Sequence, residues 1–183
     1  MSKKYELTQE SIEINGHTLH RIRALRTFGG VQAGNLGGYV ESEKNLSHEG
    51  ICWIFRDARV YGTAQVYENA RIFGNTRVYG TARVYGNARV GGSGQVYGNA
   101  RVYENALVFG KARIYDDANV FGYSKIDGNT YLYGDAHLCI TRSVYFNYIY
   151  GDAKIDHGIW THHIMIAGKD YLVSSTLEKI LLK

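Results

Sequence analysis

A six-residue hydrophobic pattern repeats without gaps through the middle of the chain. From Ile54 to Ser143 the sequence divides into fifteen hexads, in which position one is always aliphatic and position five is small in fourteen. An apolar residue every sixth position builds no stripe on an α-helix. Positions five, six, one and two instead alternate small, polar, aliphatic and aromatic, which is the period-two pattern of a strand. Glycine fills position three in ten hexads and favours a turn there. Each hexad therefore predicts one short strand and one corner of a parallel β-helix.

The aliphatic residue at position one, with a small residue two places before it, resembles the hexapeptide-repeat, left-handed parallel β-helix family. This resemblance implies an all-β fold in which three hexads form one triangular coil of 18 residues. It also implies that the coil is left-handed. The segments from His17 to Gly50 and from Tyr171 to Ile180 further resemble phage-encoded hexapeptide-repeat proteins of unassigned biochemistry.

The regions outside the regular hexads are predicted to form small irregular caps. Residues 1–50 are expected to form an N-terminal hairpin, turning at Asn15-Gly16, followed by an irregular capping coil. Residues 51–160 form the β-helix, although its register slips after Ser143. Residues 161–183 are expected to form a C-terminal hairpin or irregular coil, from Ile164–Ile166 and Tyr171–Val173, and a short helix or tail.

Side chains 18 residues apart should stack vertically and sort the surface into three faces. Face one begins at Arg59 with Tyr61, face two at Gln65 with Tyr67, and face three at Trp53 with Phe55. Face one is an unbroken tyrosine ladder beside arginines, and its predicted binding residues are Arg59, Tyr61, Arg77, Tyr79, Tyr97, Arg113, Tyr115 and Tyr133. Such a ladder could shield the sheet, bind a protein, or bind nucleic acid through arginine and stacked rings.

One hexad, VGGSGQ, departs from the others between Val90 and Gln95. It lacks the aromatic at position two and carries glycine at position five. The missing side chains at Gly91, Gly92 and Gly94 suggest a notch on face three, and drift of one repeat is the alternative. The segment lacks the lysine-serine ending of a phosphate-binding loop.

Charge, cysteine content and hydropathy indicate the cellular location and the kind of partner to expect. The net charge is +4, and residues 54–143 hold the whole excess, with eleven basic and seven acidic side chains. A basic body suits an anionic partner or a solvated surface. Cys52 and Cys139 lie far apart, and two free thiols fit a reducing compartment. No apolar run is long enough for a membrane span. We therefore expect a cytoplasmic protein of a bacterial host cell.

Catalysis and metal binding have weaker sequence support. Many proteins with this repeat are acyltransferases in which an extended loop interrupts the helix and a histidine acts as general base beside coenzyme A. Here no insertion interrupts the hexads, and His137, with Asp135 nearby, is the only histidine in them. A second cluster could ligate a metal but lacks an established spacing: Asp152, Asp156, His157, His162 and His163. No cofactor, metal or catalytic residue is expected.

The sequence thus favours a non-enzymatic protein that acts by occluding a partner. The phage resemblance makes the expected partner a host protein, for example a nucleic-acid-handling defence nuclease inhibited in the manner of anti-CRISPR proteins. The alternative is a trimeric acyltransferase-like enzyme using an acyl-CoA, and a third candidate is a virion or assembly component. Direct nucleic-acid binding and homo-oligomer formation also stay open.

Overall fold

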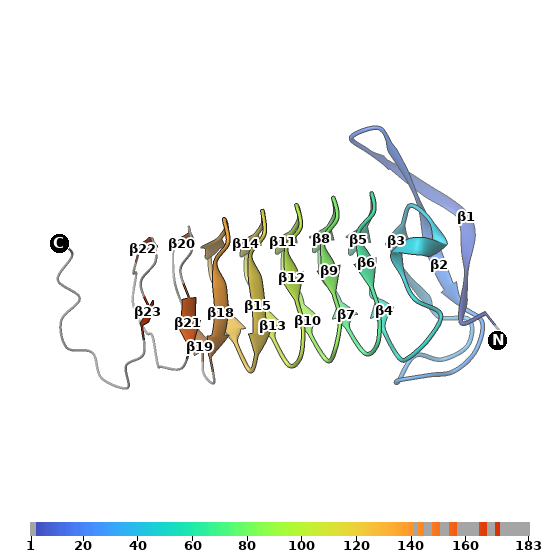
Figure 1. Cartoon of the computed structure of the whole chain (residues 1–183). Coiled ribbons are helices and arrows are strands. Elements are labelled where there is room, and N and C mark those ends of the chain that lie inside the picture. The colour runs from blue at the N-terminus through green and yellow to red at the C-terminus, as the bar shows by residue number, and fades with distance from the viewer. Residues whose placement is uncertain are drawn as a thin grey trace.

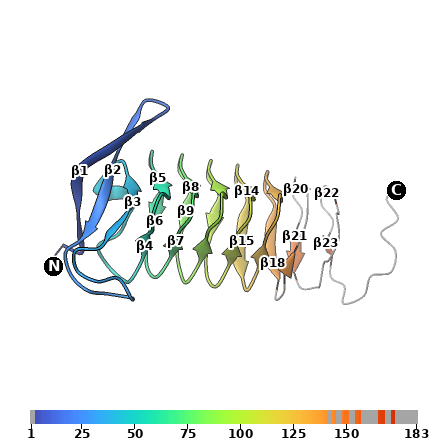
Figure 2. The same cartoon turned by 180° about the vertical axis from the view of Figure 1, so that it is seen from behind.

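A computed structural model shows the arrangement of the strands along one axis. It describes residues 3–140, 143–144, 148–150, 154–156, 165–167 and 171–172. Short parallel strands form three sheets that wrap around a common core, so the chain is an all-β parallel β-solenoid. Figures 1 and 2 show from opposite sides that the coils stack in a column with the N-terminal hairpin at one end. Within the described ranges no helix has the length and hydropathy needed to span a bilayer.

Each predicted face corresponds to one parallel ladder of strands. Face one contains β5 (Arg59–Val60), β8 (Arg77–Val78), β11 (Gln95–Val96), β14 (Arg113–Ile114), β17 (Tyr131–Leu132), β20 (Tyr148–Tyr150) and β22 (Met165–Ala167). Face two contains β6 (Gln65–Val66), β9 (Arg83–Val84), β12 (Arg101–Val102), β15 (Asn119–Gly122), β18 (His137–Ile140), β21 (Lys154–Asp156) and β23 (Tyr171–Leu172). Face three contains β4 (Trp53–Ile54), β7 (Arg71–Ile72), β10 (Arg89–Val90), β13 (Leu107–Val108), β16 (Lys125–Ile126) and β19 (Ser143–Val144).

Positions one and five of the hexads build the core. The aliphatic residues from Ile54 to Leu138 are buried, with at most 1% of their surface exposed, and the alanines at position five are completely buried. Adjacent coils are joined by backbone hydrogen bonds such as Tyr79 N to Val96 O, at 3.0 Å. This burial and pairing leave positions two, three, four and six to form the outer surface.

The N-terminal residues form a separate cap on the first coil. Strand β1 (Tyr5–Ile14) pairs antiparallel with β2 (His17–Ala24), and Asn15 and Gly16 at the turn have φ of 51° and 82°. Strand β3 (Leu36–Val40) pairs antiparallel with β2 and in parallel with β5, so the hairpin extends the face-one sheet. A short 3₁₀ helix, η1 (Glu43–Asn45), follows β3. The cap covers the strand edge and core that the first coil would otherwise expose.

Burial of a lysine anchors the start of the chain in this cap. Lys4 is completely buried, and its Nζ donates to the carbonyl oxygens of Glu49 at 3.1 Å and Cys52 at 3.0 Å, with the Cys52 Sγ at 3.2 Å. Burial lowers the pKa of Lys4 and raises the pKa of the Cys52 thiol. Tyr5 adds a 2.7 Å hydrogen bond from its hydroxyl to the Leu46 carbonyl. These contacts tie the first strand to the beginning of the solenoid.

The coil shortens by one residue after Ser143. Between β4 and β19 the paired residues are 18 apart, as in Lys125 with Ser143, whereas Tyr131 pairs with Tyr148, 17 residues later. The register slip in the sequence is therefore a shortened coil. Strands β22 and β23 pair in parallel with β20 and β21 rather than with each other, so these two strands form no hairpin. The pattern of two apolar segments around Gly168-Lys169-Asp170 does not distinguish a hairpin from two corners of a coil. The predicted tail, residues 175–183, lies outside the described residues.

Candidate binding surface

Face one carries a regular stack of tyrosine rings. Tyr61, Tyr79, Tyr97, Tyr115 and Tyr133 follow one another with ring centroids 4.8–5.1 Å apart and planes within 6° of parallel. This separation is about the distance between hydrogen-bonded strands, so each ring rests directly on the next. Stacked neighbours hold each side chain in one orientation. The eight residues predicted as the binding face all belong to this sheet or directly follow its strands.

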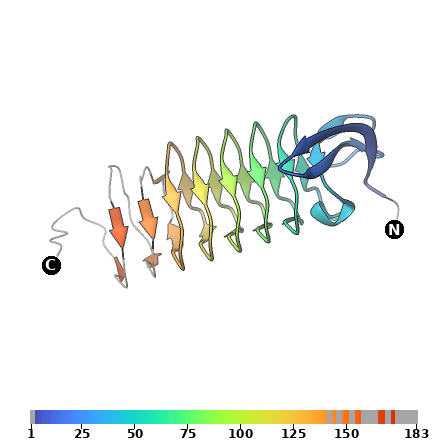
Figure 3. The same ribbon diagram turned by 90° about the horizontal axis from the view of Figure 1, so that it is seen from above.

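The N-terminal hairpin covers one end of this ladder. Its tip leans back over the first coils (Figures 1 and 3). Ile12 and Ile14 pack against the buried cluster of Leu19, Tyr39 and Tyr61, and Tyr61 keeps only 5% of its surface exposed. The His17 ring lies 5.2 Å from the Tyr61 ring. The ladder is therefore covered at Tyr61, whereas its rings from Tyr79 to Tyr133 are half-buried. The repeat pattern of the sequence did not indicate this difference.

Burial within the stack raises the pKa values of several ladder hydroxyls. Partial burial is the main cause that raises the pKa values of Tyr79, Tyr97 and Tyr115 above the ordinary tyrosine value. Neighbouring tyrosines raise the pKa values of Tyr79 and Tyr115 further, while Arg113 acts in the opposite direction on Tyr79 and Tyr97. At neutral pH this strip presents aromatic edges and neutral hydroxyl groups, which can donate or accept hydrogen bonds.

Face two carries a second, shorter aromatic ladder. Tyr67, Tyr85, Tyr103 and Phe121 stack with centroids 4.8–5.1 Å apart. Carboxylates border this face along both edges, with Glu68 and Glu104 on one side and Asp116 and Asp117 on the other. The two ladders thus share their geometry but differ in the charge around them.

Face three has a broken ladder, and the break rearranges a neighbouring ring. Gly91 stands where the pattern expects an aromatic, and a Cβ atom built there would lie 2.1 Å from Cε2 of Phe73. The Phe73 ring leans over Gly91 and reaches to within 5.7 Å of the Phe109 ring, two coils away. Gly91 is consequently buried. Gly94 is also buried, at the inward position five, and only Gly92 of the predicted notch is exposed. The notch expected at Gly91 is filled, because a flexible phenyl ring occupies the space of the missing side chain.

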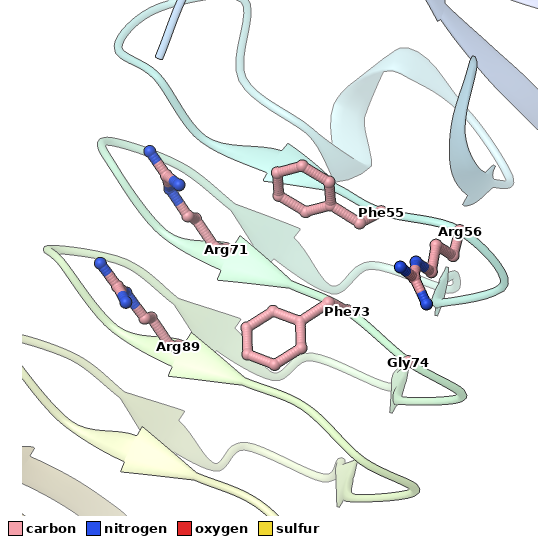
Figure 4. A pocket seen from close by; sticks show the side chains of 6 residues that line it. All are labelled: Phe55, Arg56, Arg71, Phe73, Gly74 and Arg89. Carbon is pink, nitrogen blue, oxygen red and sulfur yellow. The ribbon is translucent and has the colours of Figure 1, made fainter. Parts of the chain in front are cut away.

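The displaced ring leaves a cavity one coil nearer the N-terminal end. It has a volume of about 470 Å³ and lies between Phe55 and Phe73. Figure 4 shows both rings, with Arg71 and Arg89 on one side and Arg56 with Gly74 on the other. Arg71 is held in place by a 2.9 Å hydrogen bond from Nη2 to the Gly29 carbonyl of the cap.

A second, polar cavity lies on the face-one side of the same corner. Its volume is about 340 Å³, and its lining residues are Arg59, Asn75, Arg77, Ser93 and Gln95. Gly74 lines the first cavity and its neighbour Asn75 lines the second. Because these two residues form one corner of the coil, the two cavities flank that corner. In the described part of the chain the buried Nε of Arg59 has no hydrogen-bond partner.

Basic residues concentrate along the edge between faces three and one, which we call the basic edge. Arg56 and Lys111 add positive charge at this edge, where the described carboxylates are Asp57 and Asp127, whose Oδ1 accepts a 2.7 Å hydrogen bond from Gly128 N. The other two edges carry Glu68, Glu104, Asp116, Asp117 and Asp135. The excess charge of the repeat body is therefore local, and it adjoins both cavities.

The sequence did not indicate the aromatic cavity or its lining residues. Phe55 and Phe73 occupy ordinary position-two sites, and Arg71 and Arg89 ordinary position-six sites. The available signal was the loss of one aromatic at Gly91, which frees the ring on the preceding coil of face three to move. Periodicity fixes the direction of a Cβ atom but not the side-chain rotamer.

Among the described residues, the alternative candidates are not brought together into a site. His137 lies on face two, half-buried, and Asp135 is exposed at the preceding corner. Cys52 is buried and Cys139 is half-buried, and the two are not joined by a disulfide. Among the described residues no group of histidine, cysteine and carboxylate side chains could hold a metal. Asp152, His157, His162 and His163 lie outside the described residues, as does the side chain of Asp156.

Comparison with known proteins supports a repeat β-helix family. A family model described as the YdcK beta solenoid repeat matches residues 64–80, 82–96 and 94–110 of this chain. These segments cover coils that bear both tyrosine ladders and the break in face three. A search of curated proteins found no match. The class defined by fold and comparison is thus a parallel β-solenoid repeat protein.

Proposed function

We propose that this chain is a non-enzymatic binding protein that occludes a partner protein through face one and the adjoining basic edge. The observation that carries the proposal is the tyrosine stack, whose rings are held parallel at 4.8–5.1 Å before any partner arrives. Immobile side chains lose little conformational entropy on binding, and tyrosine and arginine are enriched among residues that dominate interface energies. A pre-ordered strip of both residue types suits a protein interface.

The surrounding charge favours face one over face two. Arg77 and Arg113 lie beside the face-one tyrosines, and Arg113 is 5.4 Å from the centre of the Tyr131 ring. Arg59 and Arg77 also line the polar cavity that adjoins this face. Face two has the same stacked rings but carboxylates along both edges. We therefore expect the partner to present an acidic surface with groups that fit against tyrosine edges.

The finer form of the proposal is an inhibitor of a host defence nuclease inside a bacterial cell. The resemblance to phage-encoded hexapeptide-repeat proteins motivates it, and a basic surface suits occlusion of an acidic face on such a nuclease. The molecule is a rigid column whose coils are tied by backbone hydrogen bonds, so it can block a surface without rearranging. Occlusion requires no catalytic group.

Affinity capture followed by an inhibition assay tests this function. The full chain is immobilised, proteins from a bacterial lysate with an active nuclease defence are captured, and retained partners are identified by mass spectrometry. Cleavage of target DNA by the purified partner is then measured with increasing amounts of this chain. The proposal expects a saturable partner and a dose-dependent loss of cleavage. Capture of only further copies of the chain would contradict it and indicate self-assembly instead.

A further inference from the structure

The aromatic cavity on face three has the volume of a small-molecule site and is open to solvent. Its volume of about 470 Å³ falls within the ordinary range for ligand pockets. Phe55 and Phe73 bound it from adjacent coils (Figure 4). In a complete ladder such rings would stack on each other, as the face-one tyrosines do. Here the tilt of Phe73 toward Phe109 separates them, and an aromatic ring of a ligand could fill the space between.

The charge around the cavity selects an anionic ligand. Three arginines line it, Arg56, Arg71 and Arg89, and no carboxylate is among the lining residues. Arg71 is already positioned by its bond to the Gly29 carbonyl, and a guanidinium has further N–H groups to donate. Arginine forks match phosphate oxygens in geometry and charge. Stacking faces and a phosphate-binding group therefore occur within one cavity.

We propose that this cavity binds a nucleotide, with the base between Phe55 and Phe73 and the phosphate against the arginines. Base stacking on aromatic side chains tolerates any base, so the site recognises the ring-plus-phosphate unit rather than a particular base. The unit could be a free mononucleotide or one nucleotide of a single strand. This site lies on face three and does not depend on the partner proposed for face one.

A substitution at Gly91 tests the site without replacing any of its lining residues. A phenylalanine at this position would restore the ladder between Phe73 and Phe109, because the atom its Cβ meets is the far end of the Phe73 ring. Gly91 is not among the positive-φ glycines, so the backbone accepts a side chain there. The displaced Phe73 would then return toward Phe55 and close the cavity. Gly91→Phe should therefore remove nucleotide binding while the stability to urea is kept or increased.

Calorimetric titration of the full chain with AMP measures the binding directly. The proposal expects saturable AMP binding that is tighter than binding of either adenosine or inorganic phosphate, because both halves of the ligand are recognised. Gly91→Phe and Arg89→Gln should each weaken AMP binding at least about 10-fold, as expected for loss of the site or of a charged hydrogen bond. Arg83→Gln, at the same hexad position on face two, is the matched control and should leave the affinity unchanged.

Specific results would overturn the nucleotide site. Unsaturable AMP binding, AMP affinity unchanged in Gly91→Phe, or inorganic phosphate binding as tightly as AMP would each contradict it. A single-stranded oligodeoxyadenylate distinguishes the two sources of the ligand. If it binds through the same residues and more tightly than AMP, the natural ligand is a strand, and if it binds no more tightly, the ligand is a free nucleotide. Failure of AMP binding would leave the face-one proposal standing.

Discussion

The glycines of the odd hexad have different structural roles at neighbouring positions. Gly92 is at a corner with φ of +71°, and a Cβ there would lie 2.5 Å from the Gly110 carbonyl oxygen of the next coil. Gly94 is at position five, where a Cβ would meet the Gly91 carbonyl oxygen at 3.3 Å. Alanine fits the equivalent site in other hexads, as at Ala58, whose amide donates to the Phe55 carbonyl at 3.2 Å. One glycine is thus required by conformation and the other is replaceable.

This difference gives a matched pair of substitutions within one hexad. We expect Gly92→Ala to destabilise the protein by more than about 1 kcal/mol, because it combines backbone strain with a clash against the next coil. We expect Gly94→Ala to stabilise it by about 0.4–1 kcal/mol, through lower entropy of the unfolded chain. Urea unfolding of both variants measures the free energies. Equal destabilisation by the two would contradict the assigned roles.

At the scale of elements, Leu19 is one of the buried side chains that hold the hairpin against the solenoid. Leu19 of β2 is completely buried in a cluster with Tyr39 and Tyr61, whereas Leu36 of β3 keeps 51% of its surface exposed. Leu19→Ala should cost about 2–5 kcal/mol of unfolding free energy, the range for a leucine lost from a packed core. Leu36→Ala is the control and should change the stability by less than about 0.5 kcal/mol.

The tyrosine ladders make stability depend on alkaline pH. Burial raises the pKa values of Tyr79, Tyr97 and Tyr115 in the folded protein above those in the unfolded chain. Their contribution to stability is therefore fully present below the unfolded tyrosine pKa of about 10 and is lost as the pH rises through the folded values. Ultraviolet titration of phenolate absorbance should give a higher midpoint for native than for urea-unfolded protein. Coincident midpoints would show that the rings are not packed as described.

The elements also show how far the sequence predicts the structure. The strands, their three faces and the Asn15-Gly16 turn follow from periodicity and turn chemistry, because the same packing problem recurs in every coil. The lean of the hairpin over Tyr61 does not, since it depends on tertiary contacts of Ile12 and Ile14. The tilt of Phe73 also escapes sequence reasoning, because it results from an empty position one coil away.

On the scale of the whole molecule, different hexad positions form the core and the surface of the solenoid. Positions one and five supply the core and are nearly uniform, so function must reside in the outward residues and in departures from the repeat. These departures are distributed unevenly around the column. The basic edge adjoins both cavities and the open part of the face-one ladder, while carboxylates occupy the other two edges. The molecule therefore has one side suited to an acidic or phosphate-bearing partner.

The most direct test compares equivalent tyrosine pairs on faces one and two. Tyr97→Ser with Tyr115→Ser removes two open rings from face one, and Tyr85→Ser with Tyr103→Ser removes two rings at the same hexad positions from face two. Both double variants lose similar stacking, so their stabilities should fall by similar amounts. Calorimetric titration with the captured, purified partner protein should show binding weakened at least about 100-fold by the face-one pair, a loss typical of interface hot spots. The face-two pair should retain the wild-type affinity. Equal affinities of the two variants, or a greater loss from the face-two pair, would contradict binding through face one.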